Sequence, residues 1–180
     1  MSRKALSRRS VIGASLAALA GPSLLKGRQE PREVSPQVAD SACVFCQIVA
    51  GSREATFVWQ DELCVAFGSL YPIQPGHVLL VPRRHVVNLY DLPPDVGAHL
   101  LPTASRIGKT LKSVLQADGL TLVQNNDKAA GQTVFHFHLH LIPRREGHEI
   151  FKTLVETKMA TQAELDGVLA PVRRALGQGR

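Results

Sequence analysis

The clearest pattern in the sequence is the alternation of histidine with apolar residues across positions 135–142. His136, His138 and His140 occupy every second position. Side chains two residues apart share one face of a β-strand, whereas a helix would distribute them around its axis. The pattern therefore predicts a strand with three imidazoles on one face and apolar side chains facing a core on the other. The apolar positions are Phe137, Leu139 and Leu141.

The remaining apolar pattern predicts a mixture of short strands and two helices. Short alternating or continuous apolar runs predict strands at residues 56–60, 63–67, 78–81 and 120–124. Helical spacing of apolar residues predicts a long helix from Pro94 to about Gln116, which Pro102 should kink or split. Thr161 and Glu164 have capping-box spacing and predict a C-terminal helix that runs to about Leu176.

The N-terminal residues differ in charge from the rest of the chain. The 180 residues suffice for one domain with a sizeable core, and their formal charge is +6. Four basic residues lie within the first nine positions, so residues 21–180 hold 17 basic and 15 acidic residues, a net charge of +2. This balance gives no support for a nucleic acid polymer as a partner.

Residues 1–20 have the order of an export signal. A basic stretch precedes a mild apolar run that ends in Ala18-Leu19-Ala20, which is typical of a secretory signal and too short to span a membrane. Ser7-Arg8-Arg9-Ser10 resembles a twin-arginine signal. We expect residues 1–20 to be this signal, residues 21–40 to be a flexible linker, and the protein to be periplasmic. The alternative is a disordered basic tail on a cytoplasmic protein.

Cys43 and Cys46 have the spacing of half a zinc site. One such pair does not complete a tetrahedron, so the remaining ligands would be histidines from elsewhere. A disulfide, which export would favour, and a redox pair are the alternatives. Cys64 lies in an apolar run and is interpreted as a buried structural thiol.

Other histidines and one polar loop are candidates for chemistry. His77 follows a loop rich in proline and glycine and opens an apolar strand; His85 follows two arginines and is a candidate metal ligand. His99 is interpreted as a helix-surface residue. The loop 125–133 offers amides, a hydroxyl and backbone N–H groups that can hold a phosphoryl oxygen. Neither a Walker motif nor Gly-x-Gly-x-x-Gly occurs, so the common nucleotide-binding folds have no support.

Four ordered segments resemble the histidine triad (HIT) family. They are Cys43–Gly51, Pro75–His85, Ala130–Val134 and His136–Ile142. The resemblance implies an α+β fold with an antiparallel sheet of about five strands, packed with one long and one shorter helix. It places a HIT domain at residues 41–150, leaves 151–180 as a C-terminal extension with a helix, and implies a symmetric homodimer.

The resemblance also implies nucleotidyl hydrolysis or transfer at the α-phosphate of nucleoside phosphoramidates, acylated nucleotides or dinucleoside polyphosphates, without an organic cofactor. His138 would be the nucleophile that forms a covalent nucleotidyl-histidine. Protonated His140 would contact the phosphate and assist the leaving group, and His77 would orient the cluster. The phosphoryl oxygens would be held by Asn125, Gly131, Gln132, Thr133 and Val134.

Bacterial family members with the Cys-x-x-Cys opening bind structural zinc. The resemblance implies a closed site with ligands Cys43, Cys46, His85 and His136. Ser69 stands where the family usually has an acidic residue for the ribose hydroxyls. That substitution motivates a second hypothesis, a non-catalytic nucleotide-binding protein with the same fold. A third hypothesis makes the histidine cluster a catalytic metal site.

Overall fold

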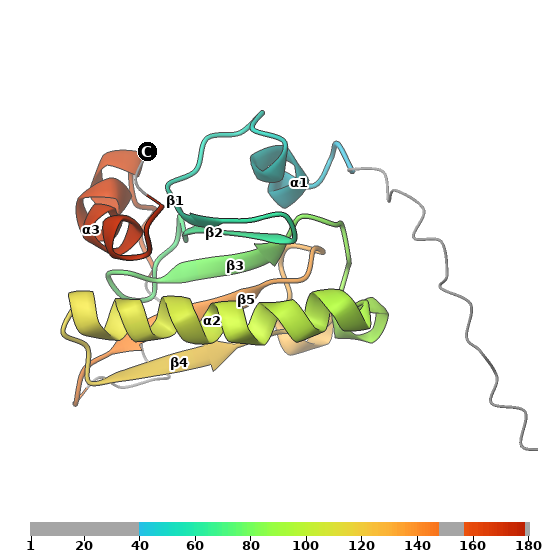
Figure 1. Ribbon diagram of the computed structural model, residues 1–180. Helices are drawn as coiled ribbons and strands as arrows, with labels where there is room; N and C mark the ends of the chain where they lie inside the picture. Colours follow the sequence, from blue (N-terminus) through green and yellow to red (C-terminus); the bar gives the residue numbers. More distant parts are fainter. Residues whose placement is uncertain (1–39, 148–156, 179–180) are drawn as a thin grey trace, which may run out of the picture. The chain divides into compact units, whose positions relative to one another are not determined.

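The structure is a computed structural model that describes residues 40–147 and 157–178. These residues form a five-stranded antiparallel sheet with the strand order β1-β2-β3-β5-β4 (Figure 1). The strands are β1 (Phe57–Gln60), β2 (Cys64–Gly68), β3 (Val78–Pro82), β4 (Gly119–Val123) and β5 (Leu139–Arg144). The α-helices are α1 (Val44–Val49), α2 (Pro94–Val114) and α3 (Gln162–Ala175), with single turns at η1 (Leu89–Asp91) and η2 (Lys128–Ala130). The predicted α+β fold is confirmed.

The long helix α2 packs across one face of the sheet (Figure 1). Its apolar stripe, which includes Leu100, Ile107 and Leu111, is almost fully buried against the strands. Pro102 does not split this helix, contrary to one expectation. Pro102 and Ala98, whose carbonyl loses its helical partner, are both exposed, so water can satisfy that carbonyl.

The opposite face of the sheet is covered by α1, a helix that the sequence did not predict. Phe45 and Ile48 pack with Phe67, Leu79 and Val81 in a second apolar cluster. Cys43 is the N-cap of α1 and Cys46 lies in its first turn. A six-residue helix is too short for a periodic pattern to reveal it.

The predicted triple-histidine strand is only partly regular. β5 begins at Leu139, so His136 and His138 precede it. The reason is that β3 ends at Pro82, which lacks an N–H and whose carbonyl is taken by His136 Nε2 at 2.9 Å. The apolar alternation still holds, because Phe137 is only 2% exposed and lies in the main core.

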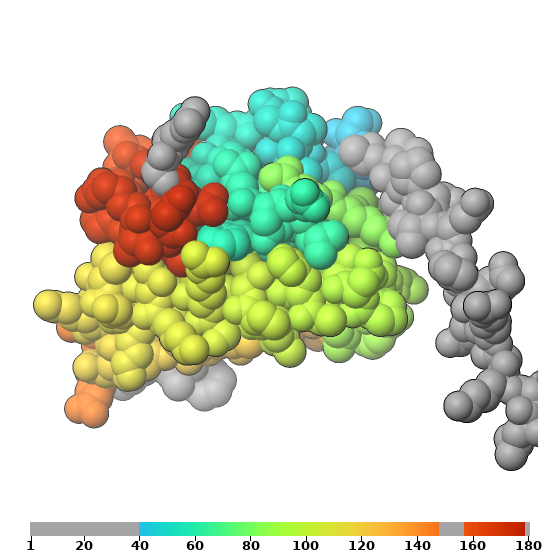
Figure 2. Space-filling model, viewed as in Figure 1, coloured from blue at the N-terminus to red at the C-terminus, as the bar shows by residue number. Residues whose placement is uncertain are grey.

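The C-terminal helix α3 shares the main core of the sheet and α2. Leu169 and Val172 are fully buried in the cluster that α2 forms with the sheet, and the predicted capping box is present. Figure 2 shows α3 on the surface beside β1 and the C-terminal half of α2. Residues 162–176 therefore belong to the same folded unit as the sheet, although we predicted from the sequence that they form an extension.

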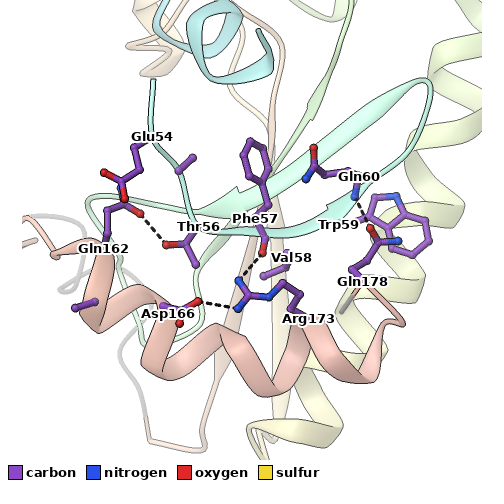
Figure 3. A pocket seen from close by; sticks show the side chains of 12 residues that line it. Glu54, Thr56, Phe57, Val58, Trp59, Gln60, Gln162, Asp166, Arg173 and Gln178 are labelled. Atoms are coloured by element: carbon purple, nitrogen blue, oxygen red, sulfur yellow. Dashed lines mark hydrogen bonds and ion pairs between the residues drawn. The ribbon is translucent and has the colours of Figure 1, made fainter. Parts of the chain in front are cut away.

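Side chains of α3 and of the residues after it bond to the free edge of β1, as Figure 3 shows. Thr56 Oγ1 donates to Gln162 Oε1 at 2.7 Å. The other two bonds run from Arg173 Nη1 to the Phe57 carbonyl and from the Gln60 N–H to Gln178 Oε1. The last two bonds occupy backbone groups that another strand would otherwise pair with.

Several sequence predictions lie outside the described residues. They concern the export signal at 1–20, the linker apart from Asp40, and residues 151–156 and 179–180 of the C-terminal extension. Within the two described ranges, no helix combines the length and hydropathy that a membrane span requires.

Candidate active site and metal site

His77 and His140 form the inner end of a hydrogen-bond chain that fixes their protons. The Ile73 N–H donates to His77 Nδ1 at 3.1 Å, so the proton of neutral His77 lies on Nε2. His77 Nε2 is 2.9 Å from His140 Nδ1 and donates to it. Neutral His140 therefore carries its own proton on Nε2, as a hydrogen-bond donor.

His138 has the opposite arrangement. Its Nδ1 lies 2.7 Å from the carbonyl oxygen of His136, which can only accept, so the proton of His138 lies on Nδ1. Nε2 consequently has a free lone pair. The ring is 5% exposed and packs edge-on against Phe45 and His140, with centroid distances of 5.1 and 4.8 Å. This geometry suits a nucleophilic imidazole.

Burial keeps these rings neutral. It lowers the pKa of His140 to about 4, and together with the neighbouring His140 and Arg144 charges it lowers the pKa of His77 to about 3. The pKa of His138 is also lowered by burial. The family resemblance implied a protonated His140. In this structure the ring is neutral and presents Nε2–H as its donor.

The histidines open into a cavity of about 340 Å³ between α1 and the adjoining ends of β2 and β3. We call this the catalytic cavity. Six of the predicted site residues line it: His77, His138, His140, Ser69, Thr133 and Val134. The structure thus brings together residues from three separate segments of the sequence.

Three predicted phosphate-binding residues, Asn125, Gly131 and Gln132, do not line this cavity. The Gln132 side chain is 2% exposed and braces the loop. Its Oε1 accepts from the Asp127 N–H at 2.8 Å, and its Nε2 donates to the carbonyls of Val87 and Val134 at 2.6 and 3.1 Å. Its amide is thus occupied within the protein.

Other cavity residues were missed from the sequence. Val44, Phe45 and Ile48 form the wall contributed by α1, and Thr157 and Gln162 come from the C-terminal segment. These three residues belong to a helix of six residues, which is too short for its period to be read from the sequence. Nothing in the local sequence indicates that Thr157 and Gln162 reach this cavity, because only tertiary packing places them there.

A second cluster lies directly beside the first. The ligand atoms of Cys43, Cys46, His85 and His136 all lie within 4.8 Å of one another, and both thiols are free. His136 Nδ1 is 3.5 and 3.6 Å from the two sulfurs, and His85 Nδ1 is 3.2 Å from Cys46 Sγ. The cysteines therefore do not form the alternative disulfide in this structure.

The protonation of this cluster fits a metal. His136 Nε2 donates to the Pro82 carbonyl, which leaves Nδ1 unprotonated toward the sulfurs. Tetrahedral zinc with ordinary bond lengths separates a sulfur and a nitrogen ligand by about 3.6 Å, close to the observed contacts. Burial raises the pKa of Cys46 to about 11, so a bound cation is needed to stabilise its thiolate. These four residues can hold a metal.

His99 lies on α2 with its side chain partly exposed, as interpreted, and it makes one specific contact. Its Nε2 pairs with Asp61 Oδ2 at 2.8 Å, which ties α2 to the β1–β2 turn. Burial alone would raise the pKa of Asp61, but bonds from His99, Trp59 and backbone N–H groups hold it well below its usual range. Cys64 is buried as predicted, and burial raises its pKa to about 12, which makes the thiol inert.

Comparisons with known proteins point in one direction. A family profile described as the HIT domain matches residues 50–147. The adenylylsulfatase HINT3 of Arabidopsis thaliana is 30% identical over 80% of this chain and 74% of its own length. Adenosine 5'-monophosphoramidase HNT1 of Saccharomyces cerevisiae is 34% identical over 62% of this chain and 68% of its own. A Zn-bound histidine triad family protein from Mycobacterium smegmatis matches with a TM-score of 0.66 and 36% identity, over 76% of this chain and 94% of its own.

Proposed function

Because the HIT profile matches more than half of its residues, the chain belongs to the HIT family, and we propose that it is a nucleotide hydrolase or transferase. Its substrates would be nucleoside phosphoramidates or dinucleoside polyphosphates, in which the α-phosphorus carries a leaving group. Two relatives with named enzymatic activities on adenylyl compounds support this substrate class. The observation that carries the proposal is the hydrogen bonding of two rings. It places the proton of His138 on Nδ1 and the proton of His140 on Nε2.

The first step follows from that division. His138 Nε2 attacks the α-phosphorus, and the bond to the leaving group breaks as the nitrogen–phosphorus bond forms. A polyphosphate leaves as an anion, and an amine leaves neutral from an N-protonated phosphoramidate. His140 Nε2–H donates a hydrogen bond to the oxygens on which charge develops.

The second step releases the nucleotide. The nucleotidyl-His138 ring is cationic because Nδ1 keeps its proton, and the His136 carbonyl stabilises that charge. Water attacks the phosphorus, the nitrogen–phosphorus bond breaks, and Nε2 recovers its lone pair. The proton from water leaves with the phosphate product and solvent. Thr133 and Val134 line the cavity where the phosphoryl group would lie. A contact from Asn125 or Gly131, which do not line the cavity, rests on the family resemblance alone.

We further propose that the Cys43, Cys46, His85 and His136 cluster holds structural zinc. The free thiols, the ligand separations and the unprotonated His136 Nδ1 support it, as does the Zn-bound histidine triad protein of similar fold. Zinc would connect α1 to the segment before β5 through coordinate bonds. It leaves no ligand position for substrate, so the chemistry rests on His138 and His140.

Two further predictions accompany the proposal. Export to the periplasm rests on residues 1–20, and cell fractionation of the native strain tests it. A symmetric homodimer rests on family resemblance, and light scattering of the purified protein tests that.

A single-turnover experiment tests the proposed function. Excess protein is mixed with an adenosine 5'-phosphoramidate or a diadenosine polyphosphate and quenched over time. The proposal expects transient protein-bound nucleotide followed by free AMP. Tight binding without turnover across both substrate classes would support the non-catalytic alternative. Complete loss of turnover in chelator, with an unchanged melting temperature, would support the catalytic metal alternative.

A further inference from the structure

The catalytic cavity extends away from the histidines along a series of adjacent strand ends. The Ser69 N–H donates to the His77 carbonyl at 2.9 Å, and the Gly68 N–H donates to the Thr56 carbonyl at 2.9 Å. These bonds link β3 to β2 and β2 to the residue before β1. Neighbouring strands are about 4.8 Å apart, so Thr56 lies roughly three spacings, or about 14 Å, from the strand of His140. That span leaves room for the sugar and base of a nucleotide whose phosphate contacts the histidines.

Polar residues from the segment before β1 and from the start of α3 also line the catalytic cavity, among them Arg53, Glu54 and Gln162. Glu54 and Gln162 both line the catalytic cavity, and both also line the groove between β1 and α3 that Figure 3 shows. Figure 3 labels both side chains among the residues that line this groove. Among the described residues that line the catalytic cavity, Glu54 carries the only carboxylate.

The amide of Gln162 is oriented by the protein. Its Oε1 accepts from the hydroxyl of Thr56, a residue only 6% exposed, so Nε2 remains as the end that can donate to a ligand. No bond from that Nε2 to another described residue is present. The Thr161–Glu164 capping box fixes the helix start, and the Ala160 N–H bonds to the Leu70 carbonyl at 2.8 Å.

Close packing holds α3 in this position. A Cβ added to Gly68 would lie 2.8 Å from Leu169 Cδ1 and 3.2 Å from Leu165 Cδ2, so any larger residue there would require these leucine side chains to shift. Gln162 is consequently a positioned group at the far end of the cavity and not a mobile surface amide.

The two side chains offer two acceptors and one donor. A carboxylate accepts at both oxygens, and the amide nitrogen donates. Cytosine presents the same set along its pairing edge, and guanine is the base that complements it with two N–H donors and one carbonyl. Adenine offers one donor and one acceptor on that edge, and hypoxanthine lacks the exocyclic amine.

We propose that Glu54 and Gln162 form a base-reading subsite that selects guanine, so that the preferred substrates are guanosine 5'-phosphate derivatives. This inference rests on the proposed function for the position of the phosphate. Glu54 accepts from the two N–H groups of the base, and Gln162 Nε2 donates to its carbonyl.

Equilibrium titration of GMP, IMP and AMP into the full-length protein tests the subsite. Wild-type protein binds GMP about tenfold or more tightly than IMP or AMP, as expected for paired hydrogen bonds to a base edge. Glu54→Gln removes this preference, and Gln162→Leu reduces it. Glu62→Gln is the matched control, because Glu62 is an exposed carboxylate that lines no part of the cavity and should leave the preference intact.

Equal binding of the three nucleotides by the wild type overturns the inference, as does the absence of GMP binding or a preference that survives Glu54→Gln. Failure of the proposed function looks different. In that case GMP still binds selectively, but no covalent nucleotide forms in single turnover. Turnover without any base preference would contradict the base-reading subsite but would still support the hydrolase proposal.

Discussion

His136 and His138 lie two residues apart in one continuous segment, yet their surroundings give them opposite properties. His136 donates from Nε2 to the Pro82 carbonyl and directs an unprotonated Nδ1 toward two cysteines. His138 donates from Nδ1 to the carbonyl of His136 and directs an unprotonated Nε2 into the catalytic cavity. The first faces a closed cluster, and the second faces a space that a substrate can enter.

The difference shows that one backbone carbonyl decides the chemistry of each imidazole. A carbonyl accepts only, so the nitrogen beside it must carry the proton, and the other nitrogen becomes a ligand or a nucleophile. Both residues are histidines of one segment, but each meets a different carbonyl and a different set of neighbours. The following predictions test whether this separation is real, in decreasing order of effect.

Replacement of the nucleophile should have the largest effect. His138→Ala removes the lone pair that the proposal assigns to attack on the α-phosphorus, so kcat/KM should fall at least about 10³-fold. The metal content and the melting temperature should stay close to those of the wild type, because the cluster around His136 is intact. Steady-state kinetics, with metal analysis on the same sample, provides the check. Substantial turnover by this variant would end the assignment of His138.

Loss of a thiol should affect stability instead. Cys46→Ser removes a ligand from the closed cluster, so the protein should lose its bound metal and about 2–5 kcal/mol of unfolding free energy. Cys64→Ser is the control, because Cys64 is equally buried but lies outside the cluster. Metal stoichiometry and urea unfolding distinguish the two variants. If both retained the same metal content, the cluster would not be a metal site.

Acid should destabilise the active-site end. The pKa values of His77 and His140 are lowered to about 3 and about 4, below the ordinary value of 6.5. Between the ordinary pKa and these lowered values, the two histidines bind protons in the unfolded chain but not in the folded protein. The unfolding free energy therefore decreases as pH falls below 6.5. The decrease can reach about 1.4 kcal/mol per pH unit for each histidine.

The variant His140→Asn isolates one of these contributions. Its unfolding free energy should depend on pH less steeply than that of the wild type, by close to one proton. Urea unfolding across the acid range measures both slopes, and a repeat in chelator separates proton-linked metal release from the histidines. Identical slopes for the two proteins would show that His140 is not held neutral by the fold.

Much of the fold follows from local pattern, and the limits of that pattern are physical. The long amphipathic helix, the capping box at Thr161 and the strands beside the core all have a periodicity that burial imposes. α1 escaped prediction because six residues give no usable period. β5 begins later than predicted, at Leu139, because the Pro82 carbonyl accepts from the His136 side chain. No pattern within 136–142 reveals this bond.

The site divides in the same way. His77, His138 and His140 carry a chemical signature and could be identified from the sequence. Gln132 had the right residue type for phosphate binding, but its amide bonds to the loop's own backbone, which only the three-dimensional structure shows. Gln162 is far from the triad in the chain, and the packing of α3 against Gly68 is what brings it to the cavity.

The separation of His136 from His138 is tested most directly by locating the covalent nucleotide. Wild-type protein is quenched during a single turnover and digested under conditions that preserve the nitrogen–phosphorus bond, and the modified residue is identified by tandem mass spectrometry. The account predicts a nucleotidyl group on His138 and none on His136 or His140. A nucleotide on either of those residues, or turnover without any modified histidine, would contradict it.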